Sequence, residues 1–309
     1  MTNQATIAWL LSGDVSIQYQ THRDLLHAER PDLQRRIATE GWGAAYLSRR
    51  HADGSWGRGF YQPKWISTHY TLLDLRNLAI APDQPQIRES VIHVLTHHKG
   101  AGGGVNPARS SEESEVCVTG MCLNYACYFG APPDLLVSIV DYILGEQMAD
   151  GGFNCQRTRP GARHGSLHST LSVLEGILAY TRQGYTYRAA ELEHAAAAGR
   201  EFILMHRLYK SDHTGAIIRR NFLHLAFPPR WKYNILRALD YFRAAGVPWD
   251  ERMADARDAL LAKRKADGRW RAEAAHPGEV HLVMETPRQP SHWNTLLALR
   301  VLNTFGATT

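Results

Sequence analysis

The chain has 309 residues, 44% of them hydrophobic, which is enough to bury a substantial core. Its formal net charge of +5 is spread along the sequence, which permits an anionic ligand but predicts no nucleic-acid partner. The opening MTNQATIAWLLSGD lacks the basic start of a signal peptide, and no apolar run approaches the ~20 residues of a membrane span. The 4 cysteines form no regular framework. These features predict a cytoplasmic protein with reduced thiols.

A glycine-rich turn followed by an aromatic or aliphatic residue recurs along the chain. It reads ADGSW at 52–56, AGGGV at 101–105, ADGGF at 149–153 and ADGRW at 266–270, with a weaker copy, DHTGAI, at 212–217. Amphipathic segments precede the turns, and a short polar loop and a much more apolar segment follow each one. This period predicts five helical hairpins of roughly 50 residues each.

In chain order, the hairpins follow a degenerate first element at 1–35 and occupy 36–82, 83–132, 133–184, 190–246 and 250–306. Amphipathic outer helices are expected over 87–98, 135–147 and 251–265. Apolar inner helices are expected over 69–78, 117–130, 168–180, 232–246 and 292–306. Gly130 and Gly246, each with a proline two residues later, are typical of helix ends.

The inner segments are apolar nearly all round, so they need cover on every side. Closing the hairpins into a ring supplies that cover, whereas an open solenoid would need a polar cap after the last hairpin. The sequence therefore predicts an all-α protein with one domain over residues 1–309, an α/α toroid of five to six helical hairpins around a central cavity.

The turns ADGSWGRGFYQPKW and ADGGFNCQ resemble repeats of the terpenoid cyclases and of the β subunits of protein prenyltransferases. The resemblance extends over about residues 40–306 and implies an α/α toroid with a central cavity. The Asp-rich acid motif of the cyclases is absent, so a squalene-type cyclase is not expected.

The resemblance also implies a zinc site. In the prenyltransferase β subunits an Asp-x-Cys pair at the start of one inner helix and a His at the start of the next hold zinc. Here Glu115-Val116-Cys117 matches the first element, with Glu in place of Asp, and His168 matches the second. The implied metal ligands are Glu115, Cys117 and His168.

The spacing of the cysteines bears on the same site. Cys117, Cys122 and Cys127 lie five residues apart, which points their thiols in three directions around a helix, so they cannot share one metal. Cys122 and Cys127 are expected to be small buried core residues. Cys117 differs because the repeat aligns it with residues at the starts of the other inner helices, namely His69, His168, Lys232 and His292.

Geometry limits which of these aligned residues can share a metal. Packed helices lie about 8–10 Å apart and zinc lies about 2.0–2.3 Å from its ligands, so two adjacent inner helices can share one ion. A site with three protein ligands leaves an open position that suits catalysis. His69 is an alternative third ligand, and Cys155 and His164 are reserves.

Other residues are candidates for catalysis and substrate binding. His69 and His292 are the candidate catalytic residues, and Glu279, His281 and Glu285 in the long loop before the last helix could supply a general acid or base. Cations near a helix start bind phosphate or carboxylate, and aromatic side chains line apolar pockets. The substrate-binding candidates are Trp65, Arg219, Arg220, Lys232, Tyr233 and Trp293.

Three functions remain open at this level. The first is a zinc-dependent enzyme with its active site in the toroid cavity, acting on an isoprenoid or a small anionic, phosphate-bearing substrate as a prenyltransferase-like transferase or a metal-dependent hydrolase or lyase. The second is a metal-free cyclase or binding protein for isoprenoid-like lipids. The third is a protein-binding scaffold without enzymatic activity.

Overall fold

The computed structural model describes residues 4–108, 113–155 and 162–306. Over these residues all regular elements are helices, and extended pairing is limited to isolated bridges, which confirms the all-α class. Unit 2 comprises the described residues of Arg49–Arg76 and Pro82–Met205, and unit 1 comprises the others. Within the described residues, no helix combines the length and apolar character needed to cross a membrane.

Helices lie in every segment for which a hairpin is predicted. From α5 to α10 they are α5 (Thr68–Asn77), α6 (Pro85–His97), α7 (Val116–Tyr128), η1 (Pro133–Leu136), α8 (Val137–Gly145), α9 (Leu167–Arg182) and α10 (Ala189–Met205). The helices of unit 1 are α1 (Gln4–Leu11), α2 (Val15–Leu25), α3 (Pro31–Arg36), α4 (Gly41–Leu47), η2 (Arg220–Leu223), α11 (Ile235–Ala244), η3 (Glu251–Met253), α12 (Ala254–Ala262) and α13 (His292–Phe305).

The inner and outer helices differ in burial as their sequences predict. In the inner helix α7, the residues from Val116 to Cys127 are all buried. The outer helix α6 buries one stripe, made of Ile87, Ser90, Val91, Val94 and Leu95. Spacings of three and four residues place this stripe on one face of the helix, so α6 covers the core while α7 lies within it.

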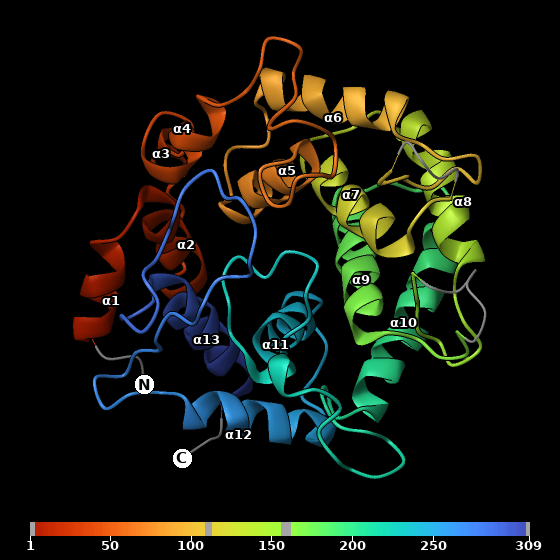
Figure 1. Ribbon diagram of the computed structural model, residues 1–309. Coiled ribbons are helices and arrows are strands. Elements are labelled where there is room, and N and C mark those ends of the chain that lie inside the picture. The colour runs from red at the N-terminus through yellow and green to blue at the C-terminus, as the bar shows by residue number, and fades with distance from the viewer. Residues whose placement is uncertain (1–3, 109–112, 156–161, 307–309) are drawn as a thin grey trace. The chain divides into compact units, whose positions relative to one another are not determined.

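Close packing of α7 against α9 brings together the segments that carry the candidate site (Figure 1). The contact uses a glycine from each helix, Gly120 and Gly176. A Cβ atom on Gly120 would lie 2.7 Å from the Ser172 carbonyl oxygen and from Val173 Cα, and one on Gly176 would meet the Gly120 carbonyl. The backbones of the two helices therefore approach more closely than any side chain at these positions would allow.

Four of the glycine-rich turns are fastened to the inner helix that follows them. In each case the backbone N–H of the aromatic or aliphatic residue after the glycines donates to a threonine Oγ1 near the helix start. The pairs, which we call threonine clamps, are Trp56–Thr68, Val105–Thr119, Phe153–Thr170 and Trp270–Thr295, at 2.9, 2.9, 2.9 and 3.1 Å. Each clamp satisfies a buried backbone donor, so the turn has a fixed position relative to the helix start.

Three helix boundaries show how far local sequence signals determine where a helix begins or ends. Gly130 and Gly246 adopt φ values of +68° and +69° just after α7 and α11, as predicted for glycines that end helices. The fourth inner helix starts later than the expected residue 232, because the Asn234 side chain accepts a hydrogen bond from the Arg237 N–H and caps it there. Lys232 and Tyr233 consequently precede α11.

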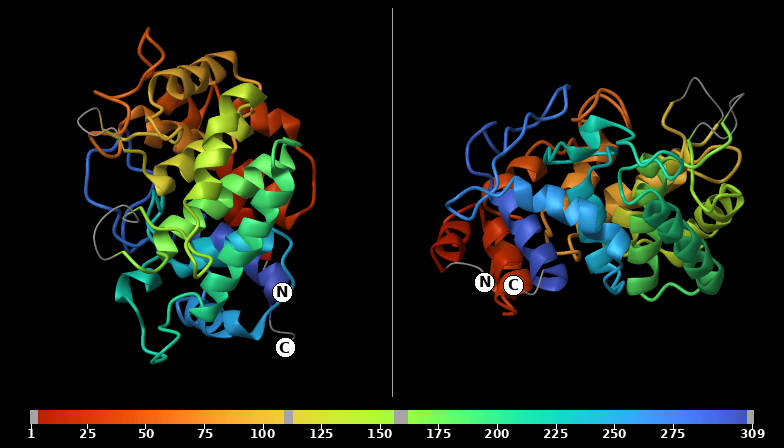
Figure 2. Two further views of the ribbon diagram at one scale, coloured as in Figure 1. Left: turned by 90° about the vertical axis from the view of Figure 1, so that its right-hand side faces the viewer. Right: turned by 90° about the horizontal axis from the view of Figure 1, so that it is seen from below.

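Unit 1 has its own core around α13, which packs against α11 and α2. In the view from below in Figure 2, the dark-blue α13 lies beside the red N-terminal helices. The predicted degenerate first element thus includes a core helix, since α2 buries seven of its 11 residues. Arg300 of α13 binds Asp24 of α2 and Asp240 of α11, which joins the three helices by partly buried ion pairs.

Candidate metal centre

Two segments of unit 2 bring together a carboxylate and two thiols. Glu115 directly precedes α7 with an extended backbone, and Cys117 is the second residue of that helix. Cys155 follows the turn 149–153, which the clamp between Phe153 and Thr170 holds against the start of α9. Because α7 and α9 pack closely, the residue after this turn reaches the start of α7.

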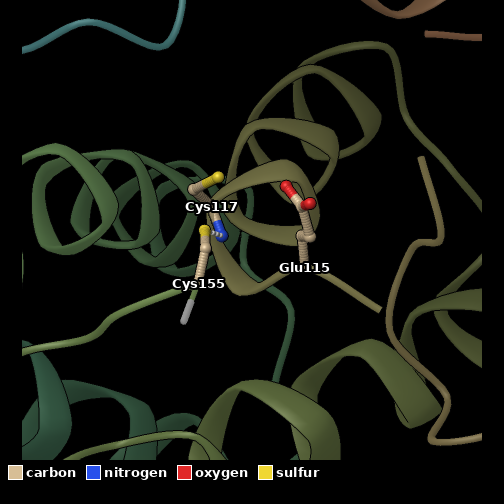
Figure 3. Close-up of side chains that lie close together, drawn as sticks. All are labelled: Glu115, Cys117 and Cys155. Atoms are coloured by element: carbon tan, nitrogen blue, oxygen red, sulfur yellow. Dashed lines mark hydrogen bonds between the residues drawn. The ribbon is translucent and has the colours of Figure 1, made fainter. Parts of the chain in front are cut away.

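The ligand atoms of Glu115, Cys117 and Cys155 all lie within 4.8 Å of one another (Figure 3). Two ligands of a tetrahedral zinc ion at 2.0–2.3 Å are separated by about 3.3–3.8 Å, so small side-chain rotations would let these three atoms share one ion. Over the part of the chain that the structure describes, this is the one group of three or more His, Cys, Asp or Glu side chains that meets this criterion. The group could hold a metal ion.

The Cys155 sulfur is the hydrogen-bond acceptor of the site. The backbone N–H of Cys117 donates to it at 3.2 Å, shown by the dashed line in Figure 3, and the Ser169 hydroxyl donates at 3.3 Å. The Ser169 oxygen in turn accepts the Cys155 N–H at 3.3 Å. Donors aimed at a sulfur favour its thiolate form, which is the form that binds metals.

The two thiols differ in acidity because they are hydrogen-bonded to each other. Donation from Cys117 to Cys155 raises the pKa of Cys117, and burial raises it further. The same bond lowers the pKa of Cys155 against the opposing effect of burial, with additional help from the Ser169 hydroxyl. Cys155 is therefore the first of the pair to lose its proton.

Lys64 and Tyr61 lie close enough to act on the site electrostatically. Burial raises the pKa of Tyr61, and the charges of Cys117, Glu115 and Cys155 raise it further, while the Tyr61 hydroxyl is hydrogen-bonded to that of Tyr70. Lys64 Nζ lies 4.7 Å from the centre of the Tyr61 ring, and its positive charge favours the thiolate of Cys117. A cation thus stands beside a group of anionic donors.

The structure brings two of the three expected ligands together, and the third is not part of the same group. Glu115 and Cys117 belong to the group, whereas His168 is not a member of it. His168 is the second residue of α9 and is half-buried, and its carbonyl oxygen accepts the Ser172 hydroxyl at 3.1 Å. Cys155, predicted only as a reserve ligand, takes part in its place.

His69 lies in a buried cluster of aromatic rings. Its side chain has 0% exposure, and its Nδ1 is 3.3 Å from the Tyr125 hydroxyl. Burial lowers its pKa to about 3, with a further contribution from the charge of Lys64. Trp65 belongs to the same region, since its ring meets the Tyr70 ring edge-on at 4.7 Å. The catalytic role predicted for His69 stays a prediction.

The remaining candidates for catalysis and substrate binding belong to unit 1. His292 stacks on Trp9 with ring centres 3.9 Å apart, and Trp293 is buried against Phe227 at 4.1 Å. Tyr233 is buried and its hydroxyl donates to the Leu208 carbonyl at 2.5 Å, which is a structural bond.

The cationic candidates of unit 1 are more accessible than these aromatic ones. Arg219 and Arg220 are exposed at the start of η2. Lys232 is half-buried and lies 4.7 Å above the Trp231 ring. Their predicted role in substrate binding, like those of His292, Tyr233 and Trp293, stays a prediction.

Three residues at or near the candidate metal centre were missed or given too little weight at the level of sequence. Cys155 was visible as the fourth cysteine, two residues after the ADGGF turn, but no local spacing pairs it with Cys117. Lys64 stands inside the turn sequence ADGSWGRGFYQPKW, beside the predicted Trp65, without a pattern of its own. Ser169 has no sequence signal, because its role depends on the packing of α9 against α7.

Comparison with known proteins gives no assignment, because no protein-family model matches the chain and no curated protein matches it.

Proposed function

We propose that the protein is a zinc-dependent enzyme whose metal is held by Glu115, Cys117 and Cys155. The observation that carries the proposal is the meeting of one carboxylate and two thiols within 4.8 Å at the start of α7. Sulfur donors favour zinc over magnesium and calcium, which prefer oxygen. Three protein ligands leave a fourth position for a substrate or a water molecule, as in catalytic zinc sites.

The chemistry follows from the donors and their surroundings. When bound, zinc would stabilise the anion of a water molecule or of a substrate thiol at the open position. The Cys117 N–H and the Ser169 hydroxyl would hold the Cys155 sulfur in its thiolate form. Burial of Cys117 keeps bulk water from one side of the site.

Charge favours a substrate with an anionic group. Two thiolates and a carboxylate carry three negative charges, one more than zinc neutralises, and Lys64 beside them compensates the excess. At the same time the Lys64 ammonium can attract a phosphate or carboxylate of the substrate. We therefore propose a small anionic substrate. The resemblance of the turns adds the proposal that the phosphate or carboxylate belongs to an isoprenoid.

We also propose that residues 1–309 form one α/α toroid. This proposal is supported by the repeat and by the resemblance of its turns to those of the terpenoid cyclases and prenyltransferase β subunits. The succession of amphipathic and buried helices fits the same architecture.

The test is metal content, measured by inductively coupled plasma mass spectrometry on full-length protein purified without chelators. We expect about one zinc per chain, lost in Cys117→Ser and Cys155→Ser. Cys127→Ser is the matched control, because Cys127 lies in the same helix but is a buried core residue, and it should retain zinc. Absence of zinc from the unmodified chain, after supplementation with zinc, would overturn the proposal.

His168→Ala separates the two possible ligand sets. Zinc retained in this variant supports Glu115, Cys117 and Cys155, whereas zinc lost in His168→Ala and retained in Cys155→Ser supports the set implied by the family resemblance. A second measurement, binding of phosphate-bearing substrates to zinc-loaded protein, tests Lys64. We expect Lys64→Gln to weaken their binding about tenfold while leaving the zinc content unchanged.

A further inference from the structure

The two sulfurs of the candidate metal centre are placed to react with each other. Cys117 and Cys155 are free thiols from segments 38 residues apart, and their Sγ atoms lie within 4.8 Å. We propose that Cys117 and Cys155 form a reversible disulfide that switches the site between a metal-binding and an oxidised form. The disulfide itself depends only on the two thiols, whereas its effect on metal binding rests on the proposed function.

Geometry favours this pair over any other in the chain. Cys122 and Cys127 have 0% exposure and point away from Cys117 around α7, so neither can reach a partner or an oxidant. Cys155 is less buried than Cys117 and lies in a loop. A disulfide requires the two sulfurs to approach to about 2 Å, which a rotation of the Cys155 side chain within its loop can bring about.

The hydrogen bonds decide which sulfur reacts first. The Cys155 sulfur accepts the Cys117 N–H and the Ser169 hydroxyl, so it carries the developing negative charge and acts as the nucleophile toward a hydroperoxide. Cys117, the more buried thiol, is the resolving partner. A stabilised thiolate next to a second cysteine is the arrangement that redox-sensing cysteines use.

The reaction with hydrogen peroxide balances in two steps. The Cys155 thiolate attacks one peroxide oxygen, the O–O bond breaks, and the leaving hydroxide takes a proton to become water. Cys155 is thereby oxidised by two electrons to a sulfenic acid, and the peroxide is reduced. The Cys117 sulfur then attacks the Cys155 sulfur, the S–O bond breaks, and the departing hydroxide leaves as a second water with the Cys117 proton.

Oxidation would remove two of the three donors from the metal site. A disulfide sulfur has no thiolate charge, so Glu115 would remain as the only anionic ligand of the group. A bound metal would in turn protect both sulfurs from peroxide. The same site would therefore respond to the redox state of its surroundings, and reduction by a dithiol would restore it.

The experiment uses the full chain, first freed of metal with a chelator and then treated with hydrogen peroxide. Remaining thiols are alkylated under denaturing conditions, and the digest is analysed by mass spectrometry. We expect two of the 4 cysteines to be lost to alkylation and recovered as one linked Cys117–Cys155 peptide pair, which dithiothreitol separates. All 4 thiols remaining free, or a link that involves Cys122 or Cys127, would overturn the proposal.

Variants test the order of events. In Cys117→Ser the reaction should stop at a Cys155 sulfenic acid, trapped by dimedone, and in Cys155→Ser no linked peptide should form. Ser169→Ala should slow the oxidation about fivefold, because one donor to the Cys155 sulfur is lost. Cys127→Ser is the matched control and should form the link at the unmodified rate. A dimedone adduct on Cys117 rather than on Cys155 would contradict the proposed order of attack.

Zinc content, measured on portions of the same protein that are not treated with chelator, separates the two proposals. A disulfide that forms in a chain unable to bind zinc would support the disulfide and overturn both the zinc enzyme and the effect of oxidation on metal binding. Zinc binding without a disulfide would support the zinc site and overturn the disulfide. If both hold, preloading with zinc should slow formation of the linked peptide, and the oxidised chain should bind no zinc.

Discussion

The backbone N–H of Cys117 and the sulfur of Cys155, 3.2 Å apart, join the start of α7 to the segment that precedes α9. Cys117 is the second residue of α7, and Cys155 follows the glycine-rich turn at 149–153. A main-chain donor at the start of one helix thus orients a side chain from another segment. The site is consequently a property of both segments and of the packing of α7 against α9.

The Ser169 hydroxyl should matter for metal affinity, although it is not a proposed ligand. Its hydrogen bond to the Cys155 sulfur orients the thiolate, and loss of such a bond costs about tenfold or more in metal affinity. We expect Ser169→Ala to weaken zinc binding by about that factor, measured by competition with a chelating dye. Ser172→Ala is the matched control, since the Ser172 hydroxyl bonds the His168 carbonyl within α9. Equal affinities for both variants and the unmodified chain would contradict this role.

The glycine contact between α7 and α9 should be sensitive to a single methyl group. Gly120→Ala would press its Cβ against the Ser172 carbonyl and Val173, and such overpacking costs about 2 kcal/mol in the free energy of unfolding. Gly145→Ala, at the end of α8, meets no atom within 4 Å and should change stability by about 0.5 kcal/mol or less. Urea unfolding measures the free energy of unfolding of both variants. Equal unfolding midpoints for Gly120→Ala and Gly145→Ala would show that α7 and α9 can move apart without loss of stability.

The ion pairs of Arg300 should make unit 1 sensitive to acid. Burial opposes ionisation of Asp24, but the hydrogen bond of Arg23 and the charge of Arg300 outweigh it and lower the Asp24 pKa to about 2. Because this folded-state pKa lies below the unfolded value, the stabilisation is present above about pH 4 and is lost as the pH falls toward 2. The loss is about 2 kcal/mol.

A substitution isolates this contribution. Asp24→Asn should lower the free energy of unfolding at pH 7 by about 2 kcal/mol, and the difference from the unmodified chain should vanish near pH 2. Asp32→Asn removes an exposed partner of Arg30 and is the control, with a much smaller effect. Urea titrations at several pH values measure the difference. A gap between Asp24→Asn and the unmodified chain that persists at pH 2 would speak against the assignment.

The buried His69 should make the folded chain less stable in mild acid. Burial lowers its pKa to about 3, so the unfolded chain takes up a proton near pH 6.5 while the folded chain does not. Stability is therefore lost as the pH falls below about 6.5, by about 2 kcal/mol at pH 5. In His69→Phe, which keeps a ring among the surrounding aromatic side chains, this contribution should disappear, so the loss of stability toward pH 5 should be smaller by about 2 kcal/mol. His213→Gln, an exposed control, should keep it, and an unchanged pH profile in His69→Phe would refute the prediction.

The helices could be predicted from sequence because their signals are local. The expected inner helix at 117–130 is found as Val116–Tyr128, and the expected 168–180 as Leu167–Arg182. Glycine after the helix and apolar residues all round are read from a few neighbouring positions. The start of α11 was misplaced because an asparagine cap at Asn234 overrides the aligned position of Lys232.

The site was predicted only in part because its ligands come from different segments. Glu115 and Cys117 stand two residues apart, and their pattern is visible in the sequence. Cys155 reaches them through the clamp of Phe153 on Thr170 and through the glycine contact of α7 with α9, and neither interaction has a sequence spacing that names its partner. The family resemblance and the alignment of the repeats favoured His168, which is not a member of the group.

The residues that hold the turns in the threonine clamps differ from the residues that offer reactive side chains at the same helix starts. Thr119 and Thr170 fasten the turns to α7 and α9, and the residues two positions earlier, Cys117 and His168, have no part in these clamps. A substitution at either earlier position changes the chemistry offered at a helix start and leaves the fastening of the turn intact. The side chain two positions before each of these threonines can therefore change in evolution without loss of the hydrogen bond that holds the turn.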